Sequence, residues 1–237
     1  MAKKSLYEHV FSTYITLRVG MITFAVILPI AVWLWGLVFG IPLQPSISDY
    51  YWATSDAPPL ADWSIFDQYA PSRVWFVGAL FALAACLYLY KGFSAQENFA
   101  LNLAAALIVG VAIFPMCYRD NCGSFSVHGF CAIATFACLF YVMWFRSGDT
   151  LQLVSVDQRP HYRRTYRLLA LAVFALPLAA FILNALFGAR SYIFFIESSA
   201  LLLFATYWWV KTRELETTQA THKVLAGEIT TLAAQQT

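Results

Sequence analysis

Residues 191–210 read SYIFFIESSALLLFATYWWV, an apolar run interrupted by one carboxylate, that of Glu197. A helix of about 20 apolar residues is long enough to cross the hydrocarbon core of a bilayer. Five further runs of this kind lie at residues 17–39, 72–91, 98–115, 125–145 and 167–187. The sequence therefore predicts an all-α, polytopic membrane protein whose fold is a six-helix transmembrane bundle.

Composition supports the same class. The chain has 237 residues, of which 60% are hydrophobic and 12% are charged, whereas about 25% of the residues in a soluble domain are charged. The first run follows Lys3 and Lys4 as in a signal peptide, but it is too long for one and lacks a small-residue cleavage pattern, so we expect it to be retained. The net charge of +2 does not favour nucleic-acid binding.

The basic residues orient the bundle, because Lys and Arg flanking membrane spans stay on the cytoplasmic side. Twelve of the 15 basic residues fall at the termini or in even-numbered loops: Lys3, Lys4, Arg18, Lys91, Arg146, Arg159, Arg163, Arg164, Arg167, Lys211, Arg213 and Lys223. Both termini are therefore expected in the cytoplasm. Topology explains the cluster from Arg159 to Arg167, and a weaker interpretation makes it a contact for anionic lipid head groups. The polar stretch 146–166 is expected to be a surface connection.

The loop at residues 40–71 is the longest on the non-cytoplasmic side. A loop of this length is uncommon unless it is functional. Its density of Tyr, Trp and Phe predicts an aromatic cap on the bundle mouth, since these side chains favour the membrane interface. Its four aspartates lack the spacing of a calcium loop, so we interpret them as a solvated acidic surface.

The domain organisation predicted is a transmembrane domain over residues 1–210 and a cytoplasmic tail over 211–237. Six tail positions follow one another at intervals of three or four, as in a heptad seam: Leu215, Thr218, His222, Leu225, Ile229 and Leu232. One interpretation is a short coiled coil that joins copies into a homo-oligomer. The other, slightly favoured because the seam is short, is a frayed continuation of the sixth helix.

Apart from the basic residues at the cytoplasmic ends of the predicted spans, three ionisable side chains fall inside these spans, all near the non-cytoplasmic face. Arg73 opens the second span and His128 lies about one turn into the fourth. Glu197 lies roughly 9 Å into the sixth, at about 1.5 Å per residue. Ionisable groups in hydrocarbon are costly and by default indicate function. We expect these residues to meet in one cavity, with Arg73 as the charge partner of Glu197; the alternative is an ion pair that only fixes helix packing.

The segment Pro45–Tyr51 is expected to cover that cavity with hydroxyl groups and a carboxylate. Its Ser-x-Ser-Asp pattern is also that of an ordinary turn. A serine, a histidine and an acidic group suggest nucleophilic catalysis, but there is no Gly-x-Ser-x-Gly motif and we assign no triad. The candidate catalytic residues are Asp49, His128 and Glu197, and the expected ligand-binding residues are Ser46, Ser48, Tyr50, Tyr51 and Arg73.

Two of the five cysteines lie outside the apolar runs, in the loop between the third and fourth spans. Cys117 and Cys122 are favoured as a disulfide, which an oxidising compartment would permit. The same spacing suits two metal ligands, with His128 six residues further on, and free thiols are a third interpretation. Zinc sites usually have tighter pairs and a fourth ligand, so we predict no metal site and no cofactor.

Short motifs along the membrane part resemble a known group of proteins. Pro45-Ser46-Ile47-Ser48-Asp49, with His128 early in the fourth span, resembles the six-helix membrane proteins of the Frag and DRAM group. A closer resemblance is to uncharacterised six-helix proteins of bacterial membranes, on these residues: Ser46, Ser48, Tyr50, Tyr51, Arg73, Phe114, Pro115, His128 and Glu197. The resemblance implies a bacterial inner-membrane location, this fold and this site position.

The eukaryotic members of that group are associated with lipid-anchor remodelling and autophagy. The chain departs from their pattern at Ser46, where Tyr is usual, and at Tyr50-Tyr51, where Thr-Gly is usual. The resulting hypothesis is a protein that binds or modifies a membrane lipid in a pocket open to the non-cytoplasmic leaflet. The alternative is a non-enzymatic scaffold, sensor or accessory subunit whose buried charges are structural.

Overall fold

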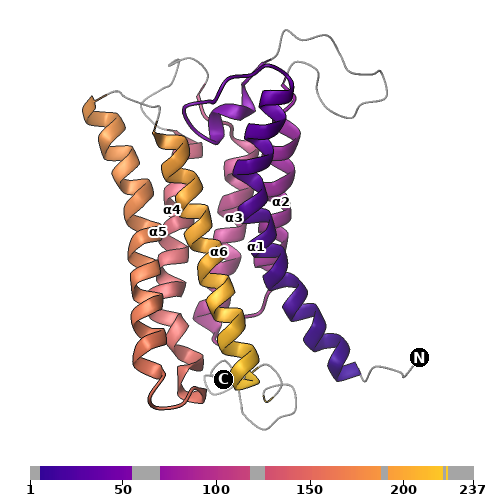
Figure 1. Cartoon of the computed structure of the whole chain (residues 1–237), viewed down its shortest axis with the longest axis vertical. Helices are drawn as coiled ribbons and strands as arrows, with labels where there is room; N and C mark the ends of the chain where they lie inside the picture. The colour runs from indigo at the N-terminus through magenta and orange to yellow at the C-terminus, as the bar shows by residue number, and fades with distance from the viewer. Residues whose placement is uncertain (1–5, 55–69, 118–125, 188–191, 221–222, 224–237) are drawn as a thin grey trace.

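Six long helices form the structure, a computed structural model that describes residues 6–54, 70–117, 126–187, 192–220 and 223. They are α1 (Leu6–Val38), α2 (Arg73–Leu89), α3 (Ala95–Ile113), α4 (Val127–Tyr141), α5 (Arg159–Phe187) and α6 (Ile193–Thr218). No β-strand occurs in these residues, which agrees with the predicted all-α class. Figure 1 shows the helices side by side along the long axis, with the start of α1 and the end of α6 at one end of the bundle. We call this the terminal end.

The opposite end, which we call the cap end, holds a short 3-10 helix, η1 (Ser48–Tyr51). Each helix contacts the next one along the chain, and α6 also contacts α1. The helices therefore close into a ring. The buried face of α1 carries Met21, Ala25, Leu28 and Val32, all at most 2% exposed and spaced by three or four residues, as expected for one side of a helix.

In the part of the chain that the structure describes, four helical stretches are long and apolar enough to cross a membrane: His9–Val38, Ala95–Ile113, Val127–Leu153 and Ile193–Thr218. The apolar α2 has 17 residues, close to the lower limit of about 17 for a spanning helix. Large apolar side chains also face outward, among them Phe99 and Leu186, each 70% exposed. Helices that are apolar on both their inner and outer faces are typical of membrane spans, so the fold is that of a membrane protein.

Serine caps set the starts of two helices. The Ser94 hydroxyl accepts a hydrogen bond from the Glu97 N–H at the start of α3, and the Ser126 hydroxyl accepts one from the Gly129 N–H at the start of α4. Such caps satisfy backbone donors that have no partner inside the helix. The start of α4 matters for the site, because His128 follows its cap by two residues.

The stretch 146–166 is not a surface connection. α4 continues into a π-helical turn, η2 (Val142–Arg146), and a 3-10 helix, η3 (Ser147–Leu153), and α5 begins at Arg159. Ser147, Thr150 and Leu151 are buried against the bundle. The polar composition concealed this, because the buried hydroxyl groups bind protein acceptors instead of water: Ser147 donates to the Met143 carbonyl and Thr150 to Glu214 of α6.

The domain boundary at residue 211 stays a prediction, and as far as it is described the chain here has the form of the interpretation in which the tail continues the sixth helix. α6 passes this position without a break and ends at Thr218, where Gln219 adopts a left-handed conformation with φ of 51°. Leu215 and Thr218, the first two positions of the predicted seam, are buried within this chain. His222, Leu225, Ile229 and Leu232 lie outside the described residues. The predicted homo-oligomer through this seam stays a prediction.

Candidate functional site

The described part of the cap loop, residues 40–54, is tied to the start of α6. The carbonyl oxygen of Pro45 accepts a hydrogen bond from the Phe194 N–H at 2.7 Å. The N–H of Ile47 donates to Oε2 of Glu197 at 2.8 Å. These contacts hold the segment 45–48 across the cap end of the bundle.

His128 is fixed between the end of α3 and the cap loop. Its Nδ1 lies 2.9 Å from the carbonyl oxygen of Phe114 and 3.1 Å from that of Val111, and its Nε2 lies 3.0 Å from Oγ of Ser48. Both carbonyls lack partners in α3 because the helix ends at Ile113. Carbonyl oxygens only accept, so Nδ1 carries the proton and Nε2 accepts from the Ser48 hydroxyl.

Ser46 and Asp49 form the predicted turn. Oγ of Ser46 donates to Oδ2 of Asp49 at 2.8 Å and accepts from the Asp49 N–H at 3.0 Å. Two contacts reach Met116: Trp52 Nε1 donates to its carbonyl oxygen at 2.7 Å, and Ser46 Oγ lies 3.7 Å from its sulfur. The turn thus orients Ser48 and joins the cap loop to the residues that follow α3.

Arg73 does not pair with Glu197. Its Nε donates to the carbonyl oxygen of Tyr51 at 2.9 Å, and its guanidinium carbon lies 4.7 Å from the ring centre of Tyr51 and 5.7 Å from that of Trp52. A guanidinium over an aromatic ring is a favourable cation–π arrangement. The expected ion pair is wrong for a physical reason: the backbone N–H of Ile47 satisfies the Glu197 carboxylate, and the aromatic cap holds the arginine.

Tyr50 anchors the cap without facing the cavity described below. It is fully buried, and its phenol oxygen accepts a weak hydrogen bond from the Gln44 N–H at 3.4 Å. Burial raises the pKa of the Tyr50 phenol, so the group is neutral at physiological pH. Its ring packs edge to face against Phe194, with centroids 6.0 Å apart. Its role is therefore to fix the loop on α6.

A cavity of about 110 Å³ lies in the centre of the bundle beneath Ile47 and Ser48. Side chains from α1, α2, α3, α4 and α6 line it, and nearly all of them are apolar. The polar exceptions are Ser48, Thr135 and Glu197. The Thr135 hydroxyl donates to the carbonyl oxygen of Cys131 at 2.8 Å, which leaves Ser48 and Glu197 as the polar groups at the cap end of the cavity.

The structure brings some of the predicted site residues together and separates others. Glu197 lines the cavity and His128 reaches its edge through Ser48, whereas Arg73 is not among the residues that line it. Asp49 faces Ser46 instead of the histidine nitrogen. The site is built from Ser48, His128 and Glu197.

The cysteine predictions fall partly outside the described residues. Cys117 is disulfide-bonded, and its predicted partner, Cys122, is not described. Within the described residues, no three side chains of the His, Cys, Asp or Glu type gather closely enough to hold a metal ion. The pairing of Cys117 with Cys122 stays a prediction.

A second polar cluster, at the terminal end, was missed by the sequence analysis. Lys211 Nζ lies 3.1 Å from Oε2 of Glu214, and the two side chains are 2% and 0% exposed. The same ammonium group donates to Oγ1 of Thr150 at 2.5 Å and to the Ser147 carbonyl at 3.1 Å. Hydroxyl groups of Thr150 and Tyr166 donate to the Glu214 carboxylate. The cluster joins η3, α5 and α6.

Arg18 and Glu97 are also buried, at 0% and 2% exposure. Glu97 accepts a hydrogen bond from the Phe93 N–H at 2.7 Å. Buried ionisable groups therefore occur at both ends of the bundle, and their restriction to the non-cytoplasmic face was wrong. The signal in the sequence is the i, i+3 pair Lys211 and Glu214, which falls in the predicted polar tail.

No family model, curated protein or solved structure matches this chain. The resemblance to the Frag and DRAM group stays a prediction. Function must therefore be argued from the site.

Proposed function

We propose that this protein spans the membrane six times, with both termini in the cytoplasm, and binds a lipid of the non-cytoplasmic leaflet. The end of an acyl chain would occupy the central cavity, and the polar part of the lipid would lie at Ser48 and His128. One observation carries the proposal: Ser48, hydrogen-bonded to His128, lies beside Glu197 at the cap end of a cavity whose other lining residues are nearly all apolar. An apolar pocket with a few convergent polar groups is the usual form of a small-molecule site.

The size of the cavity limits what it can hold. Its volume of about 110 Å³ is somewhat smaller than an engineered apolar cavity of about 150 Å³ that binds benzene. It therefore suits a chain end of a few carbon atoms. The remainder of the lipid would lie toward the cap loop, where Arg73 sits among Tyr51 and Trp52.

The polar pair also suits a modification reaction on an ester whose acyl chain has only a few carbon atoms, because the carbonyl carbon must lie at Ser48 while the chain fits the cavity. Ser48 Oγ would attack the ester carbonyl carbon while its proton moves to Nε2 of His128. The bond from that carbon to the alcohol oxygen would break, and the departing oxygen would take the proton from His128. Water would then hydrolyse the acyl-serine by the same route. The Phe114 and Val111 carbonyls hold the imidazole in the tautomer that this role requires.

Lipid binding is tested by identifying the lipids that copurify with the full-length protein. Native mass spectrometry should detect a retained acyl lipid, and Leu80→Trp should reduce its occupancy by filling the cavity that Leu80 lines. Ser199→Ala is the matched control, because Ser199 is exposed on the same helix as Glu197 and bonds only to the Phe195 carbonyl. Equal lipid retention by Leu80→Trp, the control and the unmodified protein contradicts the proposal.

The modification step needs a separate assay. A fluorophosphonate probe with an alkyl chain should label the protein at Ser48, and His128→Gln should slow the labelling at least tenfold, because general-base catalysis contributes about 10²–10⁴-fold. Peptide mass mapping locates the label. Binding of lipid without labelling would restrict the proposal to a binding protein.

A second candidate function is a non-enzymatic membrane component. The observation that favours it is the Glu197 carboxylate, whose hydrogen bond to Ile47 joins the cap loop to α6. In this case Ser48 and His128 serve the same structural purpose. Variants of all three residues would then lower thermal stability together and leave the copurified lipids unchanged.

A further inference from the structure

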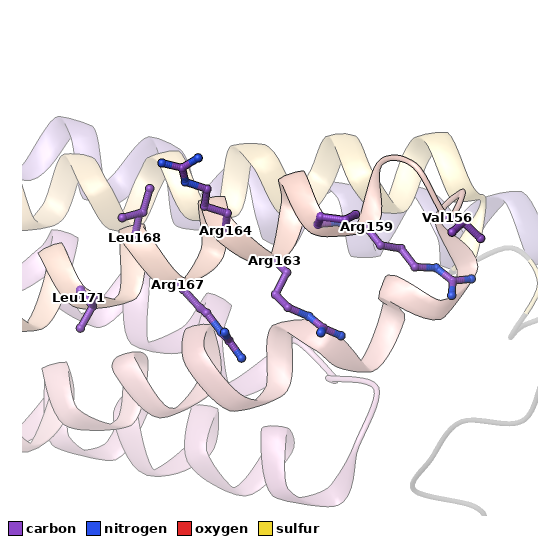
Figure 2. Close-up of a pocket in the computed structure, with 8 residues that line it drawn as sticks. Val156, Arg159, Arg163, Arg164, Arg167, Leu168 and Leu171 are labelled. Atoms are coloured by element: carbon purple, nitrogen blue, oxygen red, sulfur yellow. The ribbon is translucent and has the colours of Figure 1, made fainter.

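The first turns of α5 form a surface groove of about 510 Å³, which we call the arginine groove. Among the residues that line it are four arginines and two leucines: Arg159, Arg163, Arg164, Arg167, Leu168 and Leu171. Figure 2 shows Arg163 and Arg167 extending to one side of the helix and Arg164 to the other. The groove lies at the terminal end of the bundle, far from the Ser48 and His128 site.

Among the described residues, no acidic side chain forms an ion pair with the exposed arginines of this groove, Arg163, Arg164 and Arg167. No acidic residue lies in the first turn of α5. Cations near the N-terminus of a helix are also disfavoured by the helix dipole. The folded protein therefore keeps unfavourable electrostatic interactions here, which a bound anion would relieve.

The arginines differ in their freedom to bind a ligand. Arg159 donates to the Val154 carbonyl at 2.9 Å and to the Gln152 carbonyl at 2.7 Å, so it fixes the turn before α5. Arg167 lies with its guanidinium carbon 5.3 Å from the Trp144 ring. Arg163 and Arg164 are exposed. Arg163 and Arg167 stand four residues apart, and neighbouring guanidinium groups at this spacing suit one phosphate.

Apolar surface continues from the arginines along α5. Leu168 and Leu171 are 57% and 49% exposed. Arg163, Arg167 and Leu171 are spaced four residues apart and so lie along one side of the helix. Arg164 and Leu168 are spaced in the same way along another side. On each side, arginine is therefore followed by leucine. A ligand that matches this order has an anionic head and an apolar chain.

We propose that the arginine groove binds an anionic phospholipid of the cytoplasmic leaflet, with its phosphate between Arg163 and Arg167 and an acyl chain along Leu168 and Leu171. The assignment to this leaflet rests on the orientation given under the proposed function, but not on any ligand of the central cavity. The site is distinct in place and chemistry from the cavity beneath Ser48.

The test uses the full-length protein in nanodiscs that contain phosphatidylcholine alone or with phosphatidylglycerol. Native mass spectrometry should find phosphatidylglycerol bound in preference to phosphatidylcholine. Arg163→Gln should weaken this binding about fivefold and Arg163→Gln with Arg167→Gln about 25-fold, from the usual contribution of a basic residue near an anionic surface. Arg163→Lys with Arg167→Lys keeps the charge but loses the paired geometry. Its affinity for phosphatidylglycerol should therefore lie between that of the unmodified protein and that of Arg163→Gln with Arg167→Gln.

A charge-matched control separates a site from general surface charge. Arg213 lies near the end of α6, Lys91 follows the end of α2, and neither lines the groove, so Arg213→Gln with Lys91→Gln removes the same charge. The control should retain the binding of the unmodified protein. If the control loses as much phosphatidylglycerol binding as the groove variants, the proposal is overturned. Full displacement of the lipid by inorganic phosphate alone also overturns it. Gel filtration and circular dichroism confirm that each variant is folded.

Discussion

Nε2 of His128 lies 3.0 Å from Oγ of Ser48, although the two residues are 80 positions apart. The contact depends on two helix ends and one loop. α3 ends where it presents carbonyl oxygens to Nδ1, the cap of α4 lies two residues before the histidine, and the turn at Ser46 and Asp49 brings Ser48 over the ring. Because both side chains are held by surrounding structure, the fold fixes the geometry of the hydrogen bond between Ser48 and His128.

The first prediction concerns the energetic coupling of that pair. Ser48→Ala leaves Nε2 of His128 without its partner, at a cost of about 1–3 kcal/mol in the free energy of unfolding. In a double-mutant cycle with His128→Phe, the two changes should be non-additive by about 0.5–1.5 kcal/mol. Unfolding in mixed micelles measures each term. Ser199→Ala combined with His128→Phe is the control, and it should be additive.

The second prediction concerns Glu197 and the backbone of the cap loop. Glu197→Gln keeps an oxygen that can accept from the Ile47 N–H, so it should change the free energy of unfolding by less than about 1 kcal/mol. Glu197→Leu removes the acceptor and leaves a buried N–H unpaired, which should cost about 1–3 kcal/mol. Thermal unfolding of the purified variants gives the comparison. Equal destabilisation by both substitutions would show that charge, and not the hydrogen bond, holds the loop.

The sequence predicted the all-helical membrane fold because long apolar runs have few other stable conformations. It also placed His128 and Glu197 near one end of the bundle, since depth along a helix follows from residue number. It did not predict the partners. Whether Glu197 meets Arg73 or the Ile47 N–H depends on helix rotation and on loop conformation, neither of which the apolar pattern encodes.

At the terminal end, the sequence pattern led to the wrong expectation about burial. Thr150, Tyr166 and Glu214 are polar residues in a stretch that hydropathy assigns to loops and tail, yet they bury one another. Composition cannot distinguish a polar segment that faces water from one that is satisfied internally. Only the contacts between η3, α5 and α6 reveal the difference.

The third prediction concerns the buried pair at this end. Lys211→Met should lower the free energy of unfolding by about 3–5 kcal/mol, because it leaves the Glu214 charge buried without its cation. The double variant Lys211→Met with Glu214→Leu should be more stable than Lys211→Met, since no isolated charge remains. Denaturant unfolding of the three proteins checks the order.

The exposed pair of Arg213 and Glu216 on the same helix is the control for this prediction. Its nitrogen and oxygen lie 3.9 Å apart, and the side chains are 62% and 38% exposed. Breaking it with Arg213→Met should cost less than about 1 kcal/mol, as for most surface ion pairs. A similar cost for the two pairs would contradict the buried network.

The last prediction tests how closely α1 supports the cap. A Cβ added at Gly36 would lie 2.9 Å from Cε1 of Tyr50 and 3.4 Å from Oγ of Ser72, whereas one added at Gly78 would have no neighbour within 4 Å. Gly78→Ala should therefore stabilise the protein by up to about 1 kcal/mol through helix propensity. Gly36→Ala gains the same propensity but forces the Tyr50 ring away from α1, with a net loss of about 1–3 kcal/mol from overpacking.

Because Tyr50 follows Ser48 by two residues in η1, this displacement should also weaken lipid retention, which Gly78→Ala should leave unchanged. Stabilisation by both substitutions would mean that the cap loop moves without resistance and does not position Ser48.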